Sequence, residues 1–321
     1  MTPPDTLPIP DPSTAREHLI DPSRLPPGHR SGLVALVGRP NVGKSTLMNR
    51  LLGERLAIVT PRPQTTRRRM LGILTRPDAQ IVFVDTPGIH QPIDRLGQYM
   101  VRAARRALQD ADLIVPLLDA SRRLDADDRR VLDLARRTGP ERTLVVANKV
   151  DRAAAAELAA AEAEIARVFR AAPAFRISAL TGDGVDPLLA AMIQRLPEGP
   201  QYYPADQLAD WQLRDLAAEL IREQVLLHLR DDLPYAVEVS LEEWIDQAPD
   251  LTLLQATLFV ERDSQKGIVI GTEGQMLNQI GAAARSSLED FLAHPVRLKL
   301  RVKVQPGWRR DRAFLKRLGF G

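Results

Sequence analysis

The 321-residue sequence contains no cysteine. This absence excludes disulfides, thiolate metal ligands and thiol nucleophiles, and it favours a reducing compartment, with the cytoplasm as the default. The sequence also has no run of 18 apolar residues, which a transmembrane helix would need. With 44% hydrophobic and 26% charged residues and no long low-complexity tract, the composition is that of a globular chain long enough for about two domains.

Net charge is small but unevenly distributed. The formal net charge is only +3. Residues 205–295 contain 6 Lys and Arg and 17 Asp and Glu. Residues 296–321 contain 9 Lys and Arg and a single acidic residue, Asp311. Such a basic stripe occurs both on solvated faces and on surfaces that bind a phosphate backbone, and charge alone leaves both interpretations open.

In the first half of the chain, a proline-rich segment is followed by a regular alternation of apolar and helical stretches. Residues 1–30 contain 8 of the 25 prolines and follow no helical or strand period, so we expect a flexible tail that is not a secretory signal. From 31 to 196, apolar runs alternate with helical stretches, which predicts an α/β domain with a mostly parallel sheet and helices on both faces. The expected strands are 33–37, 81–84, 113–118, 144–147 and 175–178, with 70–74 as a hairpin partner of 81–84.

The second half follows PEGPQYYP, residues 197–204, which we interpret as a linker. The pattern then predicts an α+β domain over 205–321 that ends in a basic tail. Its expected elements are a helix at 205–229, strands at 236–245 and 252–261, a helix at 275–293 and a last strand at 296–304.

A phosphate-binding loop is predicted at residues 38–45, GRPNVGKS, which match G-x-x-x-x-G-K-[ST] between an apolar run and a helical run. The glycines let backbone amides wrap the phosphates at a helix N-terminus, Lys44 reaches the β/γ oxygens and Ser45 holds Mg²⁺. The predicted nucleotide contacts here are Gly38, Arg39, Pro40, Asn41, Val42, Gly43, Lys44, Ser45 and Thr46.

Three shorter motifs follow at the ends of later apolar runs. In DTPG, Asp85 is placed to support the metal and Gly88 to offer an amide to the γ-phosphate. In NKVD, the Asp151 carboxylate suits N1-H and N2-H₂ of guanine, which adenine does not offer. In SAL, backbone amides come near the base. The predicted contacts are Asp85, Thr86, Pro87, Gly88, Ile89, Asn148, Lys149, Asp151, Ser178, Ala179 and Leu180.

These motifs, with the stretch RPNVGKSTLMNRLLG, resemble the TrmE-Era-EngA-like class of GTPases over residues 31 to about 200. The resemblance implies that a threonine of Gln64-Thr65-Thr66-Arg67 senses Mg²⁺ and the γ-phosphate; Thr65 and Thr66 both remain open, and we favour Thr66. It implies GTP and GDP as ligands. The implied metal ligands are Ser45, Thr66 and Asp85, and the implied catalytic residues are Lys44, Thr66, Gly88 and Asn41.

Two residues of this motif set modify the expected mechanism. Ile89 stands where Ras-like GTPases carry a glutamine that orients water, so we expect slow intrinsic hydrolysis. Asn41 is similar to the asparagine by which potassium-activated members of the class hold K⁺. The alternative interpretation is that Asn41 is a turn former that tolerates unusual backbone angles.

The sequence IGTEG, residues 270–274, contains G-x-x-G, which alone is usually a turn. Its setting resembles a type II KH domain, whose loop clamps an RNA backbone. The resemblance implies a short helix at 266–270, where local β-branching favours a strand. Trp308 is expected to pack against the domain, with base stacking as the alternative. The predicted RNA contacts are Lys266, Ile270, Gly271, Thr272, Glu273, Gly274 and Arg285.

Glu273 departs from the family pattern, because family loops often carry a basic residue inside G-x-x-G. A glutamate there repels phosphate. Basic residues elsewhere are then expected to supply the attraction, including those that alternate along the last strand: Arg297, Lys299, Arg301 and Lys303.

One phosphate-binding loop, a proline-rich linker and a terminal KH domain together resemble the Era family, over residues 31–321. The two-GTPase-domain factor of the class would need a second loop, and the tRNA-modification enzyme a terminal cysteine. The resemblance implies a cytoplasmic switch that binds the 3′ region of 16S rRNA and assists 30S ribosomal subunit biogenesis, with no obligate protein partner. The alternative is a signalling or cell-cycle GTPase at the inner face of the membrane, using the KH-like domain for protein contacts. A passive RNA-binding module conflicts with the retained nucleotide motifs.

Overall fold

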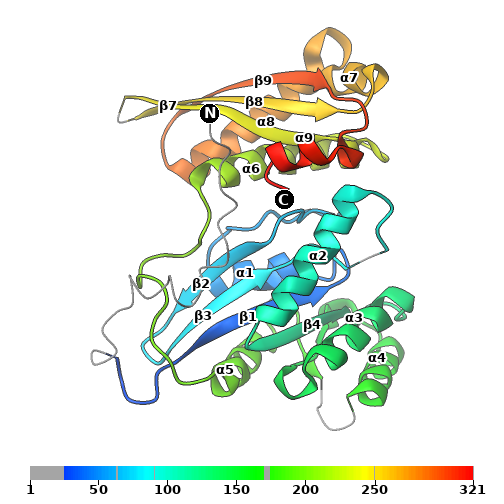
Figure 1. Ribbon diagram of the computed structural model, residues 1–321, viewed down its shortest axis with the longest axis vertical. Helices are drawn as coiled ribbons and strands as arrows, with labels where there is room; N and C mark the ends of the chain where they lie inside the picture. The colour runs from blue at the N-terminus through cyan, green and yellow to red at the C-terminus, as the bar shows by residue number, and fades with distance from the viewer. Residues whose placement is uncertain (1–24, 63, 90, 170–173, 249, 321) are drawn as a thin grey trace. The chain divides into compact units, whose positions relative to one another are not determined.

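The computed structural model describes residues 25–62, 64–89, 91–169, 174–248 and 250–320 (Figure 1). Residues 1–24 of the predicted tail lie outside the described residues, so the structure describes only residues 25–30 of it. Contacts divide the described residues into two compact units, each with its own hydrophobic cluster. Of the described residues, those within 25–57, 66–93 and 97–210 form the first unit, and those within 58–65, 94–96 and 211–320 form the second.

The first unit contains a six-stranded sheet in the order β2-β3-β1-β4-β5-β6. All neighbouring strands are parallel except β2, which pairs antiparallel with β3 as the predicted hairpin. The mostly parallel sheet is confirmed. Its strands are β1 (Arg30–Gly38), β2 (Met70–Thr75), β3 (Ala79–Asp85), β4 (Leu113–Asp119), β5 (Val146–Asn148) and β6 (Phe175–Arg176).

Helices cover this sheet because its strands are apolar on both faces. Alternate residues such as Ala35, Val37 and Val82 join a cluster with buried side chains of α2, α3 and α4. Residues of the opposite register, such as Val34 and Leu36, are equally buried, on the face that α1 and α5 cover. Figure 1 shows α2, α3 and α4 together in front of the sheet and α1 behind it. The helices are α1 (Lys44–Leu52), α2 (Arg95–Asp110), α3 (Ala126–Thr138), α4 (Ala155–Val168) and α5 (Val185–Arg195).

The segment after α5 differs from its prediction. A helix was expected from 205, but α6 (Leu213–His228) begins eight residues later. Leu208 instead accepts a hydrogen bond from the backbone of Ile73 at 2.8 Å, and Ala209 forms a bridge with Gly72. Residues 208–210 thus pair as extended backbone with the open edge of β2. This pairing outweighs their local helical pattern.

The second unit has the element order of a type II KH domain. Its sheet has the order β7-β8-β9, with β7 antiparallel and β9 parallel to β8. Figure 1 shows α6 and α8 beside this sheet, where their apolar residues share one cluster with Leu254, Ala256 and Leu258. The elements after α6 are β7 (Glu238–Ala248), β8 (Leu251–Val260), α7 (Asp263–Ile270), α8 (Gln275–Leu292), β9 (Val296–Val304) and α9 (Arg312–Arg317).

The helix α7 confirms the expectation from the KH resemblance and shows that the local preference for a strand was wrong. At its start, Gln265 Oε1 accepts hydrogen bonds from the backbone amides of Glu261 at 2.8 Å and Arg262 at 3.1 Å. Val269 is fully buried in the core of the unit. Helix capping and this tertiary contact outweigh the β-branched residues.

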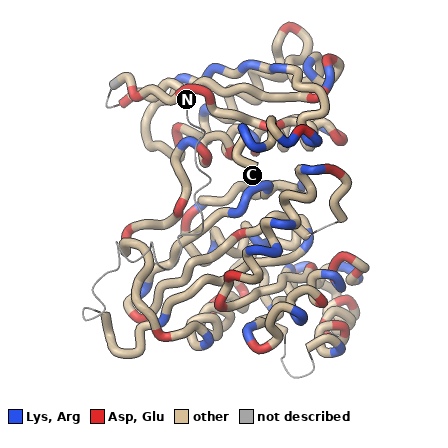
Figure 2. Tube along the Cα trace, in the orientation of Figure 1, with Lys and Arg blue, Asp and Glu red and all other residues tan. Residues whose placement is uncertain are grey.

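Strand β9 alternates as its sequence predicts. Leu298, Leu300 and Val302 pack against the core cluster of the second unit. The intervening basic residues are exposed and therefore point to the opposite face. Figure 2 shows them as blue positions along the strand.

Candidate functional site

The phosphate-binding loop joins the end of β1 at Gly38 to the start of α1 at Lys44. Two of its residues lie in the left-handed region, Asn41 with φ 62° and Gly43 with φ 102°. Asparagine and glycine are the residues that adopt this conformation most readily. The backbone angle of Asn41 therefore supports its interpretation as a turn former. The turn leaves the first amides of α1 at the loop, where a helix N-terminus attracts phosphate.

Lys44 and Asp85 form a buried pair of opposite charges in the nucleotide site. Lys44 Nζ donates hydrogen bonds to the carbonyl oxygens of Arg39 at 2.9 Å and Gly38 at 3.4 Å. Burial lowers the pKa of Lys44 to about 8, although the nearby Asp85 carboxylate opposes this shift. Burial also raises the pKa of Asp85, against the Lys44 charge and hydrogen bonds from Ser45 and Thr66. Bound phosphate and Mg²⁺ would favour the ionised form of each group.

The three predicted metal ligands converge on one point. Ser45 Oγ donates to Asp85 Oδ2 at 2.6 Å, and Thr66 Oγ1 lies 3.1 Å from Ser45 Oγ and 3.3 Å from Asp85 Oδ2. Thr65 is directed elsewhere, since its hydroxyl bonds Thr60 at 2.8 Å and the Arg62 carbonyl at 2.7 Å. This placement favours Thr66 over Thr65.

The chemistry of this group fits Mg²⁺. Asp85 Oδ1 is buried and receives no hydrogen bond from the described residues. A carboxylate oxygen and two hydroxyls are hard oxygen donors of the kind that Mg²⁺ prefers, and it commonly takes its remaining ligands from substrate phosphates and water. Ser45, Thr66 and Asp85 are therefore the residues that would hold the metal.

Asn148 links the predicted guanine end of the site to the predicted phosphate end. Its amide donates to the carbonyl of Val42 at 2.7 Å and accepts from the amide of Ala179 at 2.9 Å. Asp151 is exposed, and its carboxylate receives no hydrogen bond from the part of the chain that the structure describes, so it faces solvent. The NKVD and SAL motifs thus meet at the phosphate-binding loop, as their placement at strand ends predicts.

Lys149 is fixed by a residue that the sequence analysis did not identify. Its ammonium group contacts the carbonyl of Asn41 at 2.6 Å and Asp119 Oδ2 at 2.6 Å. Burial alone would raise the pKa of Asp119, but hydrogen bonds from Lys149 and Ser121 outweigh burial and hold this pKa below its usual value. Asp119 ends β4, so its position at a strand end was the available signal.

A second missed residue is Arg50, in the last turn of α1. Its guanidinium donates to the carbonyl of Ala179 at 3.4 Å and also to that of Leu180. Leu180 itself is 70% exposed, whereas Ser178 is buried and accepts the amide of Thr181 at 3.1 Å. Arg50 therefore links the phosphate-binding helix to the loop expected beside the base.

The DTPG motif lies against the phosphate-binding loop. The amide of Ile89 donates to the carbonyl of Gly38 at 2.9 Å, and a Cβ on Gly88 would come within 2.5 Å of the Pro40 nitrogen. Thr86 is buried, with its hydroxyl 2.8 Å from the Leu36 carbonyl. Ile89 packs into the core cluster of the first unit. Its apolar side chain has no group with which to orient water.

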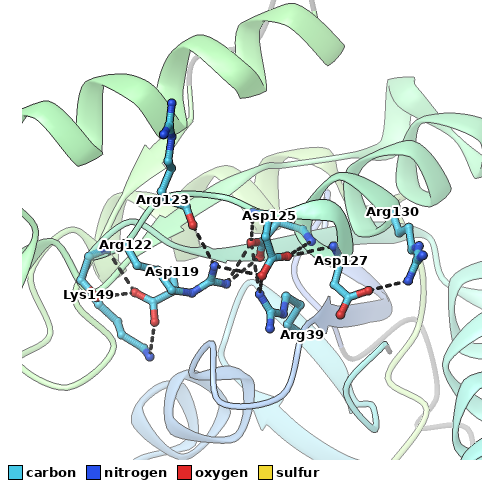
Figure 3. Close-up of polar contacts among 10 residues, drawn as sticks. Arg39, Asp119, Arg122, Arg123, Asp125, Asp127, Arg130 and Lys149 are labelled. Carbon is cyan, nitrogen blue, oxygen red and sulfur yellow. Dashed lines mark hydrogen bonds and ion pairs between the residues drawn. The ribbon is translucent and has the colours of Figure 1, made fainter. Parts of the chain in front are cut away.

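Arg39 connects the phosphate-binding loop to the start of α3 (Figure 3). It pairs with Asp125, and its distance to Asp128 is 3.6 Å. Asp125 caps α3 by accepting the amides of Asp127 and Asp128, and Arg122 reaches Asp128 at 2.9 Å. Arg39 is therefore turned toward α3, where its side chain supports the loop.

The G-x-x-G loop of the second unit is shaped by its backbone. Gly271 has φ 74°, Glu273 φ 51° and Gly274 φ 80°, so three of its four residues have positive φ. A Cβ on Gly271 would approach Met276 to 2.7 Å, whereas one on Gly274 would meet only Asn278 at 3.9 Å. Glu273 is exposed. The loop presents backbone between α7 and α8, the arrangement that a close approach to a phosphate requires.

Of the two predicted basic contacts, Lys266 lies in α7, which leads into this loop, whereas Arg285 lies farther away. Arg285 lies ten residues after Gln275 in α8, which corresponds to about 15 Å along the helix axis. The basic residues of β9 occupy the sheet face away from the core cluster. Trp308 is fully buried, and its indole donates to the Ala236 carbonyl at 2.9 Å, so it packs within the domain as expected.

Comparison with known proteins gives each unit a family. Residues 33–149 match the family described as 50S ribosome-binding GTPase, and residues 232–309 match the KH domain family. The GTPase Era of Synechocystis sp. is 46% identical over 92% of this chain and 94% of its own length. That of Thermotoga maritima is 44% identical over 90% and 97%.

The chain belongs to the Era family of GTPases. Among solved structures, Era in complex with MgGDPNP and nucleotides 1506–1542 of 16S ribosomal RNA has a TM-score of 0.87 and 38% identity, covering 91% of this chain and 99% of that one. A variant of Aquifex aeolicus Era bound to GDP and AlF₄⁻ has a TM-score of 0.86 and 37% identity, with the same coverage. The GTPase domain followed by a KH domain, predicted from the sequence, is thus the architecture of Era.

Among the residues that the structure describes, no helix is long and apolar enough to cross a bilayer.

Proposed function

We propose that this chain is a GTP-hydrolysing switch whose KH domain binds the 3′ region of 16S rRNA and assists 30S subunit biogenesis. The observation that carries the proposal is the convergence of Ser45, Thr66 and Asp85 in a chain that also presents a G-x-x-G backbone loop. An Era structure of similar fold holds both a magnesium-bound GTP analogue and a 16S rRNA segment, which supports assigning both ligands to one chain.

In the proposed mechanism the first unit positions GTP through backbone and buried side chains. Amides of the phosphate-binding loop and Lys44 bind the β- and γ-phosphates, and the Gly88 amide approaches the γ-phosphate. Asp151 accepts N1-H and N2-H₂ of guanine, while Asn148 and Lys149 hold the base loops against the phosphate-binding loop. When bound, Mg²⁺ neutralises charge on the phosphate oxygens. Lys44 remains protonated beside them and stabilises the charge that develops during transfer.

Hydrolysis is proposed to be slow without a partner. Ile89 is buried and apolar, so the chain lacks a side chain at this position that orients water. Asn41 is proposed to hold K⁺ beside the β/γ charge. The polar side chain of Asn41 on an exposed residue of the loop supports this role, and it is compatible with the left-handed turn at the same position.

RNA binding is proposed to centre on the KH loop, with Lys266, residues 270–274 and Arg285 as contacts. Open space beside Gly274 and the left-handed backbone leave room for a phosphate. The proposal locates the protein in the cytoplasm. Peripheral association with the inner face of the membrane belongs to the competing hypothesis of a signalling GTPase.

The test is stimulation of GTP hydrolysis by RNA. The full chain is assayed with GTP and Mg²⁺, alone, with a single-stranded RNA of the 16S 3′ end, and with vesicles of anionic lipid. We expect faster hydrolysis with the RNA and no effect of vesicles. Stimulation by vesicles with no response to RNA would favour the signalling hypothesis. GTP binding that is no tighter than ATP binding would contradict the assignment of the nucleotide site.

A further inference from the structure

A groove of about 590 Å³ lies between α2 and α3 of the first unit. Four arginines line it, Arg102 and Arg105 from α2 and Arg130 and Arg137 from α3, against a single acidic residue, Asp133. Figure 1 shows the two helices as neighbours on the same side of the sheet, and Figure 2 shows basic residues on both. The nucleotide site already described uses none of these residues.

Most of this positive charge is not neutralised by the protein. Arg130 pairs with Asp127 at 2.6 Å, and the closest approach of Asp133 is to Arg136, outside the groove, at 4.0 Å. Within the described ranges, Arg102, Arg105 and Arg137 form no ion pair. Like charges that face one groove repel one another, and an anion bound between them relieves that repulsion.

The lining of the groove also includes residues that neighbour the nucleotide site. Ile89, Gln91 and Pro92 contribute to its lining, directly after the DTPG motif. Ile89 in turn donates its amide to Gly38 in the phosphate-binding loop. An anion in the groove would therefore touch the segment that follows Gly88, the residue proposed to approach the γ-phosphate.

The arrangement of the arginines suits a repeating anion. Arg102 and Arg105 are three residues apart on α2, so their Cβ atoms lie about 5 to 6 Å apart on one helix face. Planar guanidinium groups match phosphate oxygens bidentately. A row of guanidinium groups beside the apolar lining residues Ile89 and Pro92 fits successive phosphates of a nucleic-acid backbone.

We propose that this groove binds a phosphodiester segment of RNA, which gives the GTPase domain an RNA contact of its own beside the DTPG motif. The choice of RNA rests on the proposed function, whereas the anionic site rests on the groove. Double-helical RNA is the discriminating ligand, because its paired bases are withheld from the KH loop while its phosphates remain accessible.

The experiment measures binding of a labelled, blunt-ended RNA duplex to the full chain with a non-hydrolysable GTP analogue at several salt concentrations. The groove variant is Arg102→Glu with Arg105→Glu. The matched control is Arg106→Glu with Arg123→Glu, two exposed arginines outside the groove that change the net charge equally. We expect the groove variant to lose about 10-fold or more in affinity and the control less than about 3-fold. The salt slope of the groove variant should fall by about 1.8, the value for two phosphate contacts.

A second probe separates this site from the KH loop. Single-stranded RNA of the 16S 3′ end should bind the groove variant nearly as well as wild type, which also shows that the variant is folded. Gly274→Asp should lose this probe but keep the duplex. Wild type that fails to bind the single strand refutes the proposed function, and wild type that binds it but not the duplex refutes only the groove.

Three further results would overturn the groove assignment. Equal losses in the groove and control variants would mean diffuse surface charge. Loss of duplex binding in Gly274→Asp would place the duplex at the KH loop. Displacement of the duplex by polyglutamate at equal charge concentration would favour an acidic protein segment as the occupant.

Discussion

The nucleotide pocket and the KH loop hold their functional atoms in different ways. In the pocket, side chains from separate motifs bond to one another, as Asn148 does to Val42 and Ala179 and Ser45 does to Asp85. In the KH loop, shape comes from positive backbone φ angles at Gly271, Glu273 and Gly274, with mainly exposed side chains. On the proposed function, the pocket is therefore a side-chain network that would fix ligand identity, whereas the loop is a backbone surface that would accept a repeating phosphate.

The comparison predicts that specificity resides in the pocket and generic affinity in the loop. A substitution in the network should change which nucleotide binds. A substitution in the loop should change how tightly RNA binds and how this affinity depends on salt. The two sets of effects should be separable, since the residues concerned belong to different units.

The largest expected effect is at the guanine end. Asp151→Asn removes a charged acceptor of two hydrogen bonds, each contributing on the order of 1.5 to 3 kcal/mol. We expect GTP affinity to fall roughly 100- to 10,000-fold and preference to shift toward xanthosine triphosphate. Competition binding with GTP, xanthosine triphosphate and ATP measures the shift. Asp186→Asn, an exposed carboxylate in the first turn of α5, is the control and should keep the preference for GTP. Retention of GTP preference in Asp151→Asn would contradict the assignment.

The next effect tests the backbone surface of the KH loop. Gly274→Asp adds bulk and negative charge where the loop is expected to meet phosphate, so RNA affinity should fall roughly 10- to 100-fold with GTP affinity unchanged. The control is Gly307→Asp, because Gly307 also has positive φ (61°) and open space around it. Binding of labelled single-stranded RNA measures both. Wild-type affinity in folded Gly274→Asp would remove the proposed RNA contact of the loop at residues 270–274.

The third effect concerns the metal end of the pocket. Thr66→Ala removes a hydroxyl from the group around Asp85, so we expect the Mg²⁺ concentration needed for half-maximal GTP hydrolysis to rise about 10-fold, on the order of 1.4 kcal/mol. Thr65→Ala is the matched control, since its hydroxyl bonds Thr60 and Arg62 instead. A larger shift for Thr65→Ala would reverse the choice between the two threonines.

The same contrast explains which parts of the molecule could be predicted. The pocket was predictable where a motif is contiguous and follows an apolar strand, as GRPNVGKS and DTPG do. Asp119 and Arg50 escaped prediction because each is a single common residue whose partner lies 30 or 129 positions away. Only the fold brings such pairs together.

Two elements of the fold escaped local prediction for a related reason. Residues 208–210 are extended because they pair with the edge of β2, although their pattern favours a helix. Residues 263–270 form a helix because Val269 is buried in a core built from distant strands. In both places a tertiary contact decides against local propensity.

A smaller expected effect tests whether Asn41 holds K⁺ in addition to forming a turn. We expect GTP hydrolysis to be severalfold faster in K⁺ than in Na⁺, because the larger ion suits a site beside the β/γ charge. Asn41→Asp keeps a residue that tolerates the left-handed conformation, whereas Asn41→Ala tests loss of the polar group. Initial rates in matched chloride salts measure the effect. Equal rates in both salts, or full K⁺ stimulation in Asn41→Ala, would leave the turn as the whole explanation.

The smallest expected effect concerns Glu273, the residue of the KH loop whose negative charge would repel an RNA phosphate. Glu273 is exposed and left-handed, so its carboxylate is free of packing constraints but lies in the predicted path of phosphate. Glu273→Gln removes the repulsion, and Glu273→Lys adds an attraction at the same backbone position. We expect RNA affinity to rise in that order, by about 3-fold overall, and the salt slope to steepen by about 0.7 for the lysine variant only. Titrations of single-stranded RNA at several salt concentrations measure both quantities. If glutamine and lysine variants bound alike, with unchanged slopes, residue 273 would lie outside the reach of the RNA backbone, and the loop would act through Gly271 and Gly274 alone.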